Sequence, residues 1–499
     1  MKIKNHKGSI FVIVLLLIIV FITLGAAFVV LSVSESKVAN RERRTYQAFD
    51  LAEAGMERAL YDLRQDFINS SGSPSWSDGN INSFMIGPNT TDFYSIPYTG
   101  TSLNGGSYSV KLKNVTGLTD ALWVQSTGVV GDTSQTIQIY AKITNLSPWG
   151  NSIFAGAGAS GAMIKGNVDI NGSVHILGTG LTSSDYAVDL GGTAELIGNN
   201  YNGIPATISA KIPALPTTDF NSETVTTLNA VLRVKHGKVG LSGSASIGEA
   251  NISGNGIKET IDSVYSNDGF GGNQGTNNIH SDNGWSNGYD LGDSVTFPSL
   301  NDPYSGYSSY KAYLKAKALV ISDAASLSTL ANITPNSNFN FTDASKGSIK
   351  MDGNGNLTVS GIVYIDGGGS LNLNKAGSNK TINYTGTGSI YVDGNAQVNV
   401  NLLTSGNNSF PNNIVGIMTP NQITFNEANI NVMGLFYAEN KIVAAKQTNI
   451  AGTIVSNYFD MGTNVPAIFQ VPSAANHLPP GLIGQTSSWS MKAVAWQKL

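Results

Sequence analysis

The sequence predicts a mainly β protein that begins with one long α-helix. Three observations predict this class: an uncharged apolar run near the N-terminus, an amphipathic continuation of that run, and strand-like repeats separated by glycines over the rest of the chain. The repeats are rich in glycine, asparagine, serine and threonine. Because 41% of the 499 residues are nevertheless hydrophobic, the composition favours a packed core over disorder.

The apolar run covers residues 10–31, which are 22 residues without a charge. At about 1.5 Å per residue, a helix of this length spans the hydrocarbon core of a bilayer, which is about 30 Å thick. The apolar region of a secretory signal peptide is shorter, at about 7–15 residues. The run therefore predicts a transmembrane helix.

Helical character continues beyond the membrane. Residues 36–67 contain no proline, and their apolar side chains recur mostly every three or four residues, which places them on one helix face. These side chains belong to Phe49, Ala52, Met56, Ala59, Leu60, Leu63 and Phe67. The pattern predicts a single helix over residues 9–67, about 90 Å long.

Four features of this region together resemble type IV pilins, and most closely the N-terminal domain of PilX-type minor pilins. They are a basic leader over residues 1–8, a Gly8–Ser9 junction, the apolar half-helix, and the sequence AFDLAEAGMERAL at residues 48–60. The resemblance covers roughly the first 65 residues. It implies that a prepilin peptidase cuts after Gly8 and leaves Ser9 as the new N-terminus. A generic membrane anchor with a helical stalk is the alternative.

One position departs from the pilin pattern. Pilins usually carry glutamate as the fifth mature residue, where it pairs with the free amine of a neighbouring subunit, but this chain has Ile13 there. An isoleucine cannot make that contact. The resemblance therefore implies a minor subunit rather than the main building block of a filament.

Residues 75–147 predict a small β-rich domain. Apolar and polar residues alternate at residues 108–112 and 136–143, which is typical of strands with one buried face. The stretch GGSYSVKLKN resembles the first globular part of PilX-like proteins. Pro148 and Trp149 mark the expected boundary of this domain.

Residues 150–465 predict a parallel β-solenoid, or β-helix. An alternating strand, a glycine and a more apolar strand recur in VDINGSVHI (168–176), LTVSGIVYI (357–365) and INVMGLFYA (430–438). With 20–25 residues per coil and about 4.8 Å between strands, the rod would be about 60 Å long. An irregular β-sandwich is the alternative. Residues 307–319 have a helical pattern, and residues 466–499 are expected to form a C-terminal tail.

Candidate chemistry in the body is sparse. Asp352, Asp366 and Asp393 adjoin glycines, where aspartate ordinarily accepts hydrogen bonds in a turn, and Arg233 is the lone arginine of the body. The stretch after Asp352 starts like a calcium loop but lacks the glycine at its sixth place and the glutamate at its twelfth, which is Val363. We therefore predict no catalytic residue, no metal site and no cofactor.

Bulk composition narrows the function further. The absence of cysteine excludes disulfides and cysteine zinc sites, and a net charge of −4 gives no reason to expect a nucleic-acid partner. The sequence thus predicts a non-enzymatic minor pilin or pseudopilin. It would be a single-pass protein of the inner membrane before assembly, and lie on a pilus or the cell surface afterwards.

The expected partners are other pilin subunits, the prepilin peptidase and the pilus assembly machinery. The β-body would prime assembly or mediate adhesion, with a surface receptor or polysaccharide as a further class of partner. Two alternatives stay open: a surface polysaccharide-active β-helix enzyme, and an unprocessed membrane-anchored structural protein of the envelope.

Overall fold

The computed structural model describes residues 7–69, 92–115, 121–145, 147–157, 164–166, 168–182, 184–215, 217–220, 223–228, 230–248, 261–267, 296–461, 466–484 and 489–498. The chain divides into two compact units. Unit 1 comprises Met1–Asn145 and Trp489–Leu499, and unit 2 comprises Leu146–Ser488. Residues 1–6 of the leader and the stretch 70–91 lie outside the described residues.

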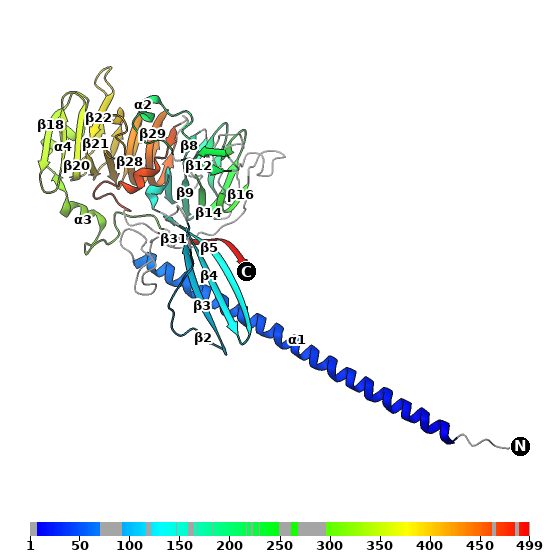
Figure 1. Ribbon diagram of the computed structural model, residues 1–499. Helices are drawn as coiled ribbons and strands as arrows, with labels where there is room; N and C mark the ends of the chain where they lie inside the picture. The colour runs from blue at the N-terminus through cyan, green and yellow to red at the C-terminus, as the bar shows by residue number, and fades with distance from the viewer. Residues whose placement is uncertain are drawn as a thin grey trace. The chain divides into compact units, whose positions relative to one another are not determined.

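Unit 1 consists of one long helix, α1 (Lys7–Asn69), and an antiparallel sheet (Figure 1). The strands are β1 (Tyr94–Ser95), β2 (Ser102–Leu103), β3 (Gly106–Asn114), β4 (Ala121–Val130), β5 (Thr133–Asn145) and β31 (Trp489–Lys498). They pair in the order β1-β3-β4-β5-β31, with β2 beside β3. The long N-terminal helix and the mainly β class predicted from the sequence are confirmed.

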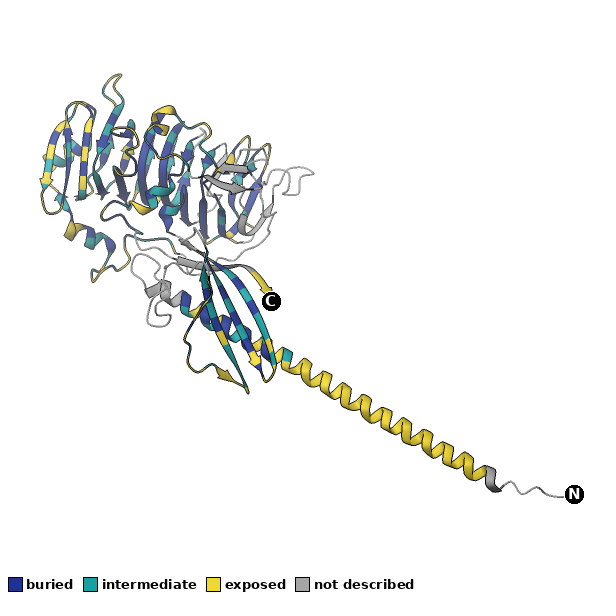
Figure 2. Ribbon diagram, in the orientation of Figure 1, coloured by how far each residue is buried: buried dark blue, intermediate teal, exposed yellow. Residues whose placement is uncertain are grey.

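The second half of α1 packs on this sheet, as its burial shows in Figure 2. The shared core contains apolar side chains from one face of the helix and from alternating positions of the strands. These are Ala52, Met56, Ala59, Leu60, Leu63, Ile96, Val110, Leu112, Leu122, Val124, Ile137, Ile139 and Ala141.

Two glycines bring the helix and the sheet into close contact. A Cβ atom on Gly128 would lie 2.0 Å from the Ala48 carbonyl oxygen, and one on Gly55 would lie 2.5 Å from Ser126 Oγ. Real Cβ atoms do not approach other atoms this closely, so these positions need glycine. The glycine in the AEAG stretch of the helix therefore has a structural reason.

Unit 2 is built from many short strands. They are β6 (Ile153–Ala157), β7 (Ile164–Gly166), β8 (Asp169–Asn171), β9 (Val174–Thr179), β10 (Tyr186–Leu190), β11 (Glu195–Gly198), β12 (Thr217–Phe220), β13 (Glu223–Thr226), β14 (Leu232–Leu241), β15 (Ser246–Ile247), β16 (Ile261–Asn267), β17 (Leu319–Ile321), β18 (Asn338–Asp343), β19 (Gly347–Asp352), β20 (Asn356–Ile365), β21 (Leu371–Leu373), β22 (Thr381–Thr385), β23 (Thr387–Val392), β24 (Ala396–Val398), β25 (Asn401–Thr404), β26 (Ile414–Thr419), β27 (Gln422–Phe425), β28 (Ile430–Ala444), β29 (Thr448–Asp460) and β30 (Ala467–Phe469). The helices are α2 (Ala206–Ser209), α3 (Tyr310–Lys317) and α4 (Ala324–Leu330).

Most of these strands pair in parallel. The longest ladder runs through β17, β20, β23, β26, β28, β29, β6, β9, β14 and β16, and every pairing in it is parallel. A second parallel ladder runs through β22, β25, β28, β29, β30, β8, β11 and β15. In a β-sandwich built from hairpins, neighbouring strands would pair antiparallel, so these parallel ladders favour the solenoid interpretation.

The glycine of the repeated frame marks a bend, as the sequence predicts. Gly434 in β28 pairs in register with Gly452 in β29, and both have positive φ, +154° and +135°. A Cβ on Gly452 would lie 2.0 Å from the Gly434 carbonyl oxygen, so neighbouring layers meet closely where the strands turn. Residues on either side of Gly434 therefore join different ladders.

The order of strands in the longest ladder differs from their order in the chain. The chain enters next to the middle of the ladder with β6, proceeds to one end at β16, and resumes at the other end with β17 (Figure 1). It then returns to the middle, where β29 pairs with β6. Trp149 Nε1 donates a hydrogen bond to the Ile483 carbonyl, 2.7 Å away, so the beginning and the end of unit 2 are in contact.

The predicted C-terminal tail over residues 466–499 is corrected by these pairings. Residues 467–469 form β30 within the ladders of unit 2, and residues 489–498 form β31, which pairs antiparallel with β5 in unit 1. The helical pattern at residues 307–319 does form α3. The sequence WSMKAVAWQK is a strand because β5 offers it an otherwise open edge.

Candidate functional site

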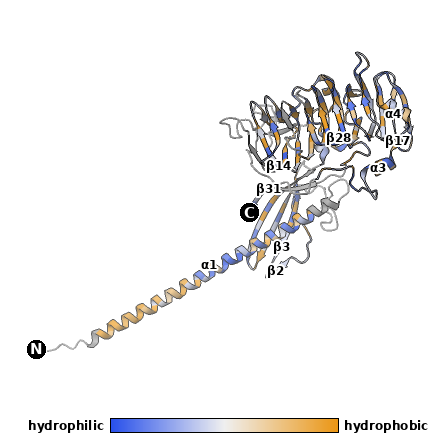
Figure 3. Ribbon diagram, turned by 180° about the vertical axis from the view of Figure 1, so that it is seen from behind, coloured by the Kyte–Doolittle hydropathy of each residue, from blue (hydrophilic) through white to orange (hydrophobic). Residues whose placement is uncertain are grey.

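The first half of α1 exposes an apolar surface along its whole length (Figure 3). From Ile10 to Val33, each large hydrophobic side chain has between 41% and 69% of its surface exposed. Among the described residues, one helix is long and apolar enough to cross a membrane, and it is this one. Because so much apolar surface is unfavourable in water, lipid or other protein must cover it.

The three site residues from the sequence lie at the start of this helix. Gly8 and Ser9 belong to the first turn of α1, and Ile13 follows about one turn later with 57% of its side chain exposed. The side chains of residues 7–9 are outside the described part of the structure. Cleavage after Gly8 therefore stays a prediction, as does the meaning of Ile13.

Polar contacts fix the second half of α1 to the rest of unit 1. Arg58 donates hydrogen bonds to the Tyr108 hydroxyl and the Thr99 carbonyl, at 2.9 and 3.0 Å, and its guanidinium lies 4.1 Å from the centre of the Tyr98 ring. Tyr98 in turn donates a 2.7 Å hydrogen bond to Asp62. Burial, reinforced by that hydrogen bond, raises the pKa of Tyr98, so its hydroxyl stays protonated.

Two of the candidate carboxylates in unit 2 are paired with lysines of α3. Lys311 Nζ lies 2.5 Å from Asp393, and Lys315 Nζ lies 2.6 Å from Asp366. Burial on its own would raise the pKa of Asp393, but the Lys311 ion pair and the Gly368 N–H lower it below its usual value. These carboxylates anchor α3 to the strands.

Asp352 holds a turn. It accepts hydrogen bonds from Asn354 N, Asn356 N and Asn356 Nδ2 at 2.8, 3.1 and 2.7 Å. These contacts lower the pKa of Asp352 to about 2. The Asp352 carboxylate, at the first position of the calcium-like spacing, thus binds amide groups of the chain itself. In the described residues no group of three or more acidic or histidine side chains could hold a metal ion.

The remaining titratable candidates are dispersed. Arg233 lies in β14 next to His175 of β9, in register across the ladder. His175 is fully buried, with its ring 5.1 Å from that of Phe154. His236, three residues after Arg233 in β14, and His477 are exposed. His6 and His280 fall outside the described residues.

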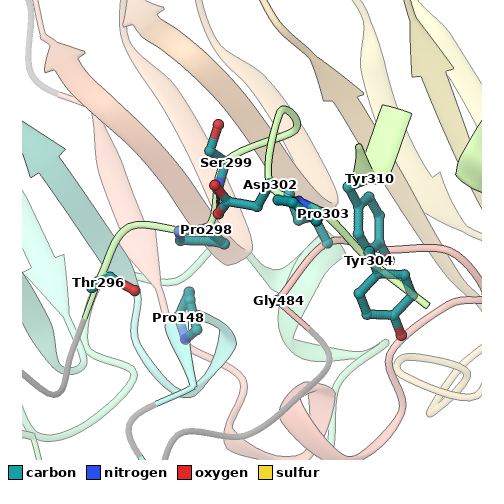
Figure 4. A pocket seen from close by; sticks show the side chains of 10 residues that line it. Pro148, Thr296, Pro298, Ser299, Asp302, Pro303, Tyr304, Tyr310 and Gly484 are labelled. Atoms are coloured by element: carbon teal, nitrogen blue, oxygen red, sulfur yellow. Dashed lines mark hydrogen bonds between the residues drawn. The ribbon is translucent and has the colours of Figure 1, made fainter. Parts of the chain in front are cut away.

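Unit 2 also has a pocket that the sequence reading missed (Figure 4). Its volume is about 230 Å³, and it is lined by Pro148, Thr296, Pro298, Ser299, Asp302, Pro303, Tyr304, Tyr310, Ile483 and Gly484. The Tyr304 and Tyr310 rings lie 4.6 Å apart, and Tyr310 donates its hydroxyl to the Leu482 carbonyl at 3.1 Å. The closely spaced tyrosines of PYSGYSSYKAY are the signal that could have indicated it.

This pocket is smaller than the 300–1,000 Å³ typical of small-molecule sites. Asp302, the one carboxylate in its lining, accepts a hydrogen bond from Ser299 N at 3.1 Å. The lining comes from three parts of the chain near Trp149, which are Pro148, residues 296–310 and residues 483–484. Its side chains thus close the region where the chain enters and leaves unit 2.

Comparison with known proteins finds similarity among solved structures. No family model matches the sequence, and no curated protein matches it. Among solved structures, the fold is similar to the crystal structure of the competence-associated pilin ComZ from Thermus thermophilus. The TM-score is 0.52 at 20% identity, over 91% of this chain and 97% of that chain. The fold is pilin-like. At this identity the similarity concerns the fold and not the PilX family in particular.

Proposed function

We propose that this chain is a minor subunit of a type IV pilus-type filament. Its helix α1 first anchors it in the inner membrane and later joins it to other pilin subunits. A prepilin peptidase removes the leader after Gly8, and the assembly machinery transfers the subunit from the membrane to the filament. Unit 2 is displayed outwards, where it primes assembly or mediates adhesion.

The observation that carries this proposal is the division of α1 into two halves. The second half packs on the sheet of unit 1 through Ala52, Met56 and Ala59, whereas the first half, from Ile10 to Val33, is uncovered. An anchor alone does not need a rigid continuation that is fused to a folded domain. A helix that must carry its domain from lipid to a protein filament does, because the domain and the helix then move as one body.

The similarity to a competence-associated pilin supports the same proposal, because it extends over both units and not only over the helix. Ile13 supports the assignment as a minor subunit. An isoleucine in the apolar half keeps the helix free of a buried charge, but it removes the carboxylate with which pilins bind the amine of a neighbour.

The experiment is mass spectrometry of the N-terminus and of filaments sheared from cells that have an active prepilin peptidase. We expect the wild-type chain to begin at Ser9 and to be present in the filaments. The variant Gly8→Val should keep residues 1–8 and stay in the membrane. Gly25→Ala is the matched control, since a Cβ there meets no atom within 4 Å and the residue lies inside the apolar half. An intact Met1 in the wild-type chain would overturn the proposal.

A further inference from the structure

The pocket in unit 2 has walls made largely of rings (Figure 4). Half of its lining residues are prolines or tyrosines, namely Pro148, Pro298, Pro303, Tyr304 and Tyr310. Proline rings are apolar, and a tyrosine ring has a face of negative potential. These walls therefore suit a ligand whose outer surface is apolar, and more so if that ligand is positively charged.

The walls are held in place by bonds within unit 2. Tyr304 and Tyr307 exchange two backbone hydrogen bonds, of 3.2 and 2.9 Å, around a tight turn whose two central residues have positive φ. The Tyr437 hydroxyl donates a 2.6 Å hydrogen bond to the Pro298 carbonyl. Because the walls are fixed before a ligand arrives, binding costs little ordering of the protein.

A glycine leaves room on one side of the pocket. A Cβ atom on Gly484 would lie 3.5 Å from Cγ of both Pro148 and Pro298, so a side chain there would lie between two lining prolines. The opposite situation holds at Asp302 and Pro303, which are exposed to solvent. The pocket is therefore open to solvent beside its one carboxylate.

The charge of the pocket is negative. No lysine, arginine or histidine is among the described residues that line it, whereas Asp302 is. Ser299 connects Asp302 to a second carboxylate, because its N–H donates to Asp302 at 3.1 Å and its hydroxyl donates to Glu439. Neither carboxylate forms an ion pair with another described residue. The pocket therefore favours a cation over an anion.

The lining also indicates which kind of cation fits. A metal ion needs several oxygen ligands, and Asp302 is the one carboxylate among the described lining residues. A primary ammonium is strongly hydrated and would lose water against the proline walls. A quaternary ammonium has no N–H groups and an outer surface of methyl groups, and aromatic faces attract it. At about 230 Å³ the pocket has room for a small head group of this kind.

We propose that this pocket binds a quaternary ammonium group of the size of choline. Tyr304 and Tyr310 supply the aromatic faces, the prolines supply the apolar contacts, and Asp302 supplies the opposite charge. The inference goes beyond the proposed function and does not depend on it, because every lining residue belongs to unit 2 and none to α1.

The test is a titration of the full chain, in a non-ionic detergent without a choline head group, followed by NMR of the ligand's methyl signals. Choline should bind with a dissociation constant in the millimolar range, as expected for so small a ligand. The neutral analogue 3,3-dimethyl-1-butanol has the same shape without the charge. It should bind about tenfold more weakly, or less.

The variants separate charge from shape. Asp302→Asn should weaken choline binding about fivefold or more and leave the neutral analogue unaffected, since the asparagine oxygen still accepts from Ser299 N. Asp185→Asn is the matched control, because Asp185 accepts from Thr182 N at 2.8 Å in the same local pattern and lies outside the pocket. Tyr304→Phe keeps the ring and should bind choline within about twofold of the wild-type chain, whereas Tyr304→Leu should bind it about fivefold more weakly.

Phosphocholine in the same assay distinguishes two sources of the ammonium group. Binding within about threefold of choline supports a head group carried on a phosphate, and binding of choline alone supports a free cation. Equal binding of choline and the neutral analogue, equal losses in Asp302→Asn and Asp185→Asn, or binding of glucose but not choline would overturn the inference. These comparisons need no disruptive variant, so they hold even if Tyr304→Leu does not fold.

The outcome is separate from that of the proposed function. If the leader is removed and the chain is present in filaments but choline does not bind, only this inference fails. If choline binds while the leader stays intact and filaments lack the chain, only the proposed function fails.

Discussion

We expect a buried histidine to make the stability of unit 2 depend on pH. His175 lies in β9, between Phe154 of β6 and Arg233 of β14 in register, and it is completely buried. Neither ring nitrogen has a hydrogen-bond partner among the residues that the structure describes. Burial, together with the nearby cations Arg233 and Lys235, lowers the pKa of His175 from 6.5 to about 3.

The sign of the effect follows from where the proton binds. Below pH 6.5 the unfolded chain protonates this histidine, whereas the folded chain resists protonation until about pH 3. The folded state is therefore at full stability above pH 6.5 and loses stability as the pH falls through this window. At pH 4 the free energy of unfolding has fallen by about 1.4 kcal/mol for each of about 2.5 pH units, or by about 3.5 kcal/mol.

The assay is hydrogen exchange of the backbone amides of β9 and β14 in the full chain between pH 7 and pH 4, corrected for intrinsic exchange rates. In the variants His175→Phe and His175→Gln, the exchange of these amides should not increase as the pH falls. Between pH 7 and pH 4, the equilibrium constant for opening should increase about 100-fold or more in the wild-type chain relative to the variants. Because glutamine is polar and phenylalanine is not, the two variants should differ in stability at pH 7. The change of stability with pH should be the same in both.

Two results would refute this reasoning. One is a set of parallel stability curves for the wild-type chain and both variants. The other is an imidazole titration of His175, followed by NMR, with a midpoint near 6.5 in the folded protein.

Three further predictions concern other parts of the molecule. Gly128→Ala should destabilise unit 1 by about 2 kcal/mol, because the added Cβ meets helix backbone, and should lower its melting temperature by about 4–8 °C. Thr127→Ala, on the other face of β4, should have a much smaller effect; equal shifts in the two variants would contradict the close-contact argument. Because the pKa of Asp352 is lowered to about 2, the turn at residues 352–356 should keep its amide NMR shifts above pH 3.8 and lose them as the pH falls through 2, whereas Asp352→Ala should show the loosened turn at neutral pH. Deletion of residues 489–499 should expose the edge of β5 and promote aggregation, which light scattering would detect; a monodisperse truncated chain would argue that β31 is dispensable.

Local patterns in the sequence predict much of the fold. The uncharged run of residues 10–31 and the helical spacing after it predict α1, because both signals come from residues that are neighbours in the chain. The strand–glycine–strand frame around Gly434 predicts a bent strand for the same reason. Both elements can be predicted because they depend on the spacing of residues that lie within about ten positions of one another in the chain.

The order of strands in the ladders and the place of β31 depend on contacts between distant residues. The frames at residues 168–176 and 357–365 are alike, so neither one specifies its neighbours in the stack. The partner of β31 is β5, on the far side of unit 2 in the sequence. The pocket near Tyr310 was missed because its walls come from segments that meet only after the ladders have formed.

The position of unit 2 between β5 and β31 has a mechanical consequence. Asn145 and Trp489 are opposite each other in an antiparallel pair, so two covalent connections leave unit 1 from neighbouring strands and lead to the same unit. A pull on unit 2 is shared between them, and each strand resists it through hydrogen bonds along its whole length. Inside unit 2 the two connections lead to β6 and to β30, and both strands pair with β29, so the force enters away from the ends of the longest ladder. A body attached in this way can bear a load without being unwound from either end.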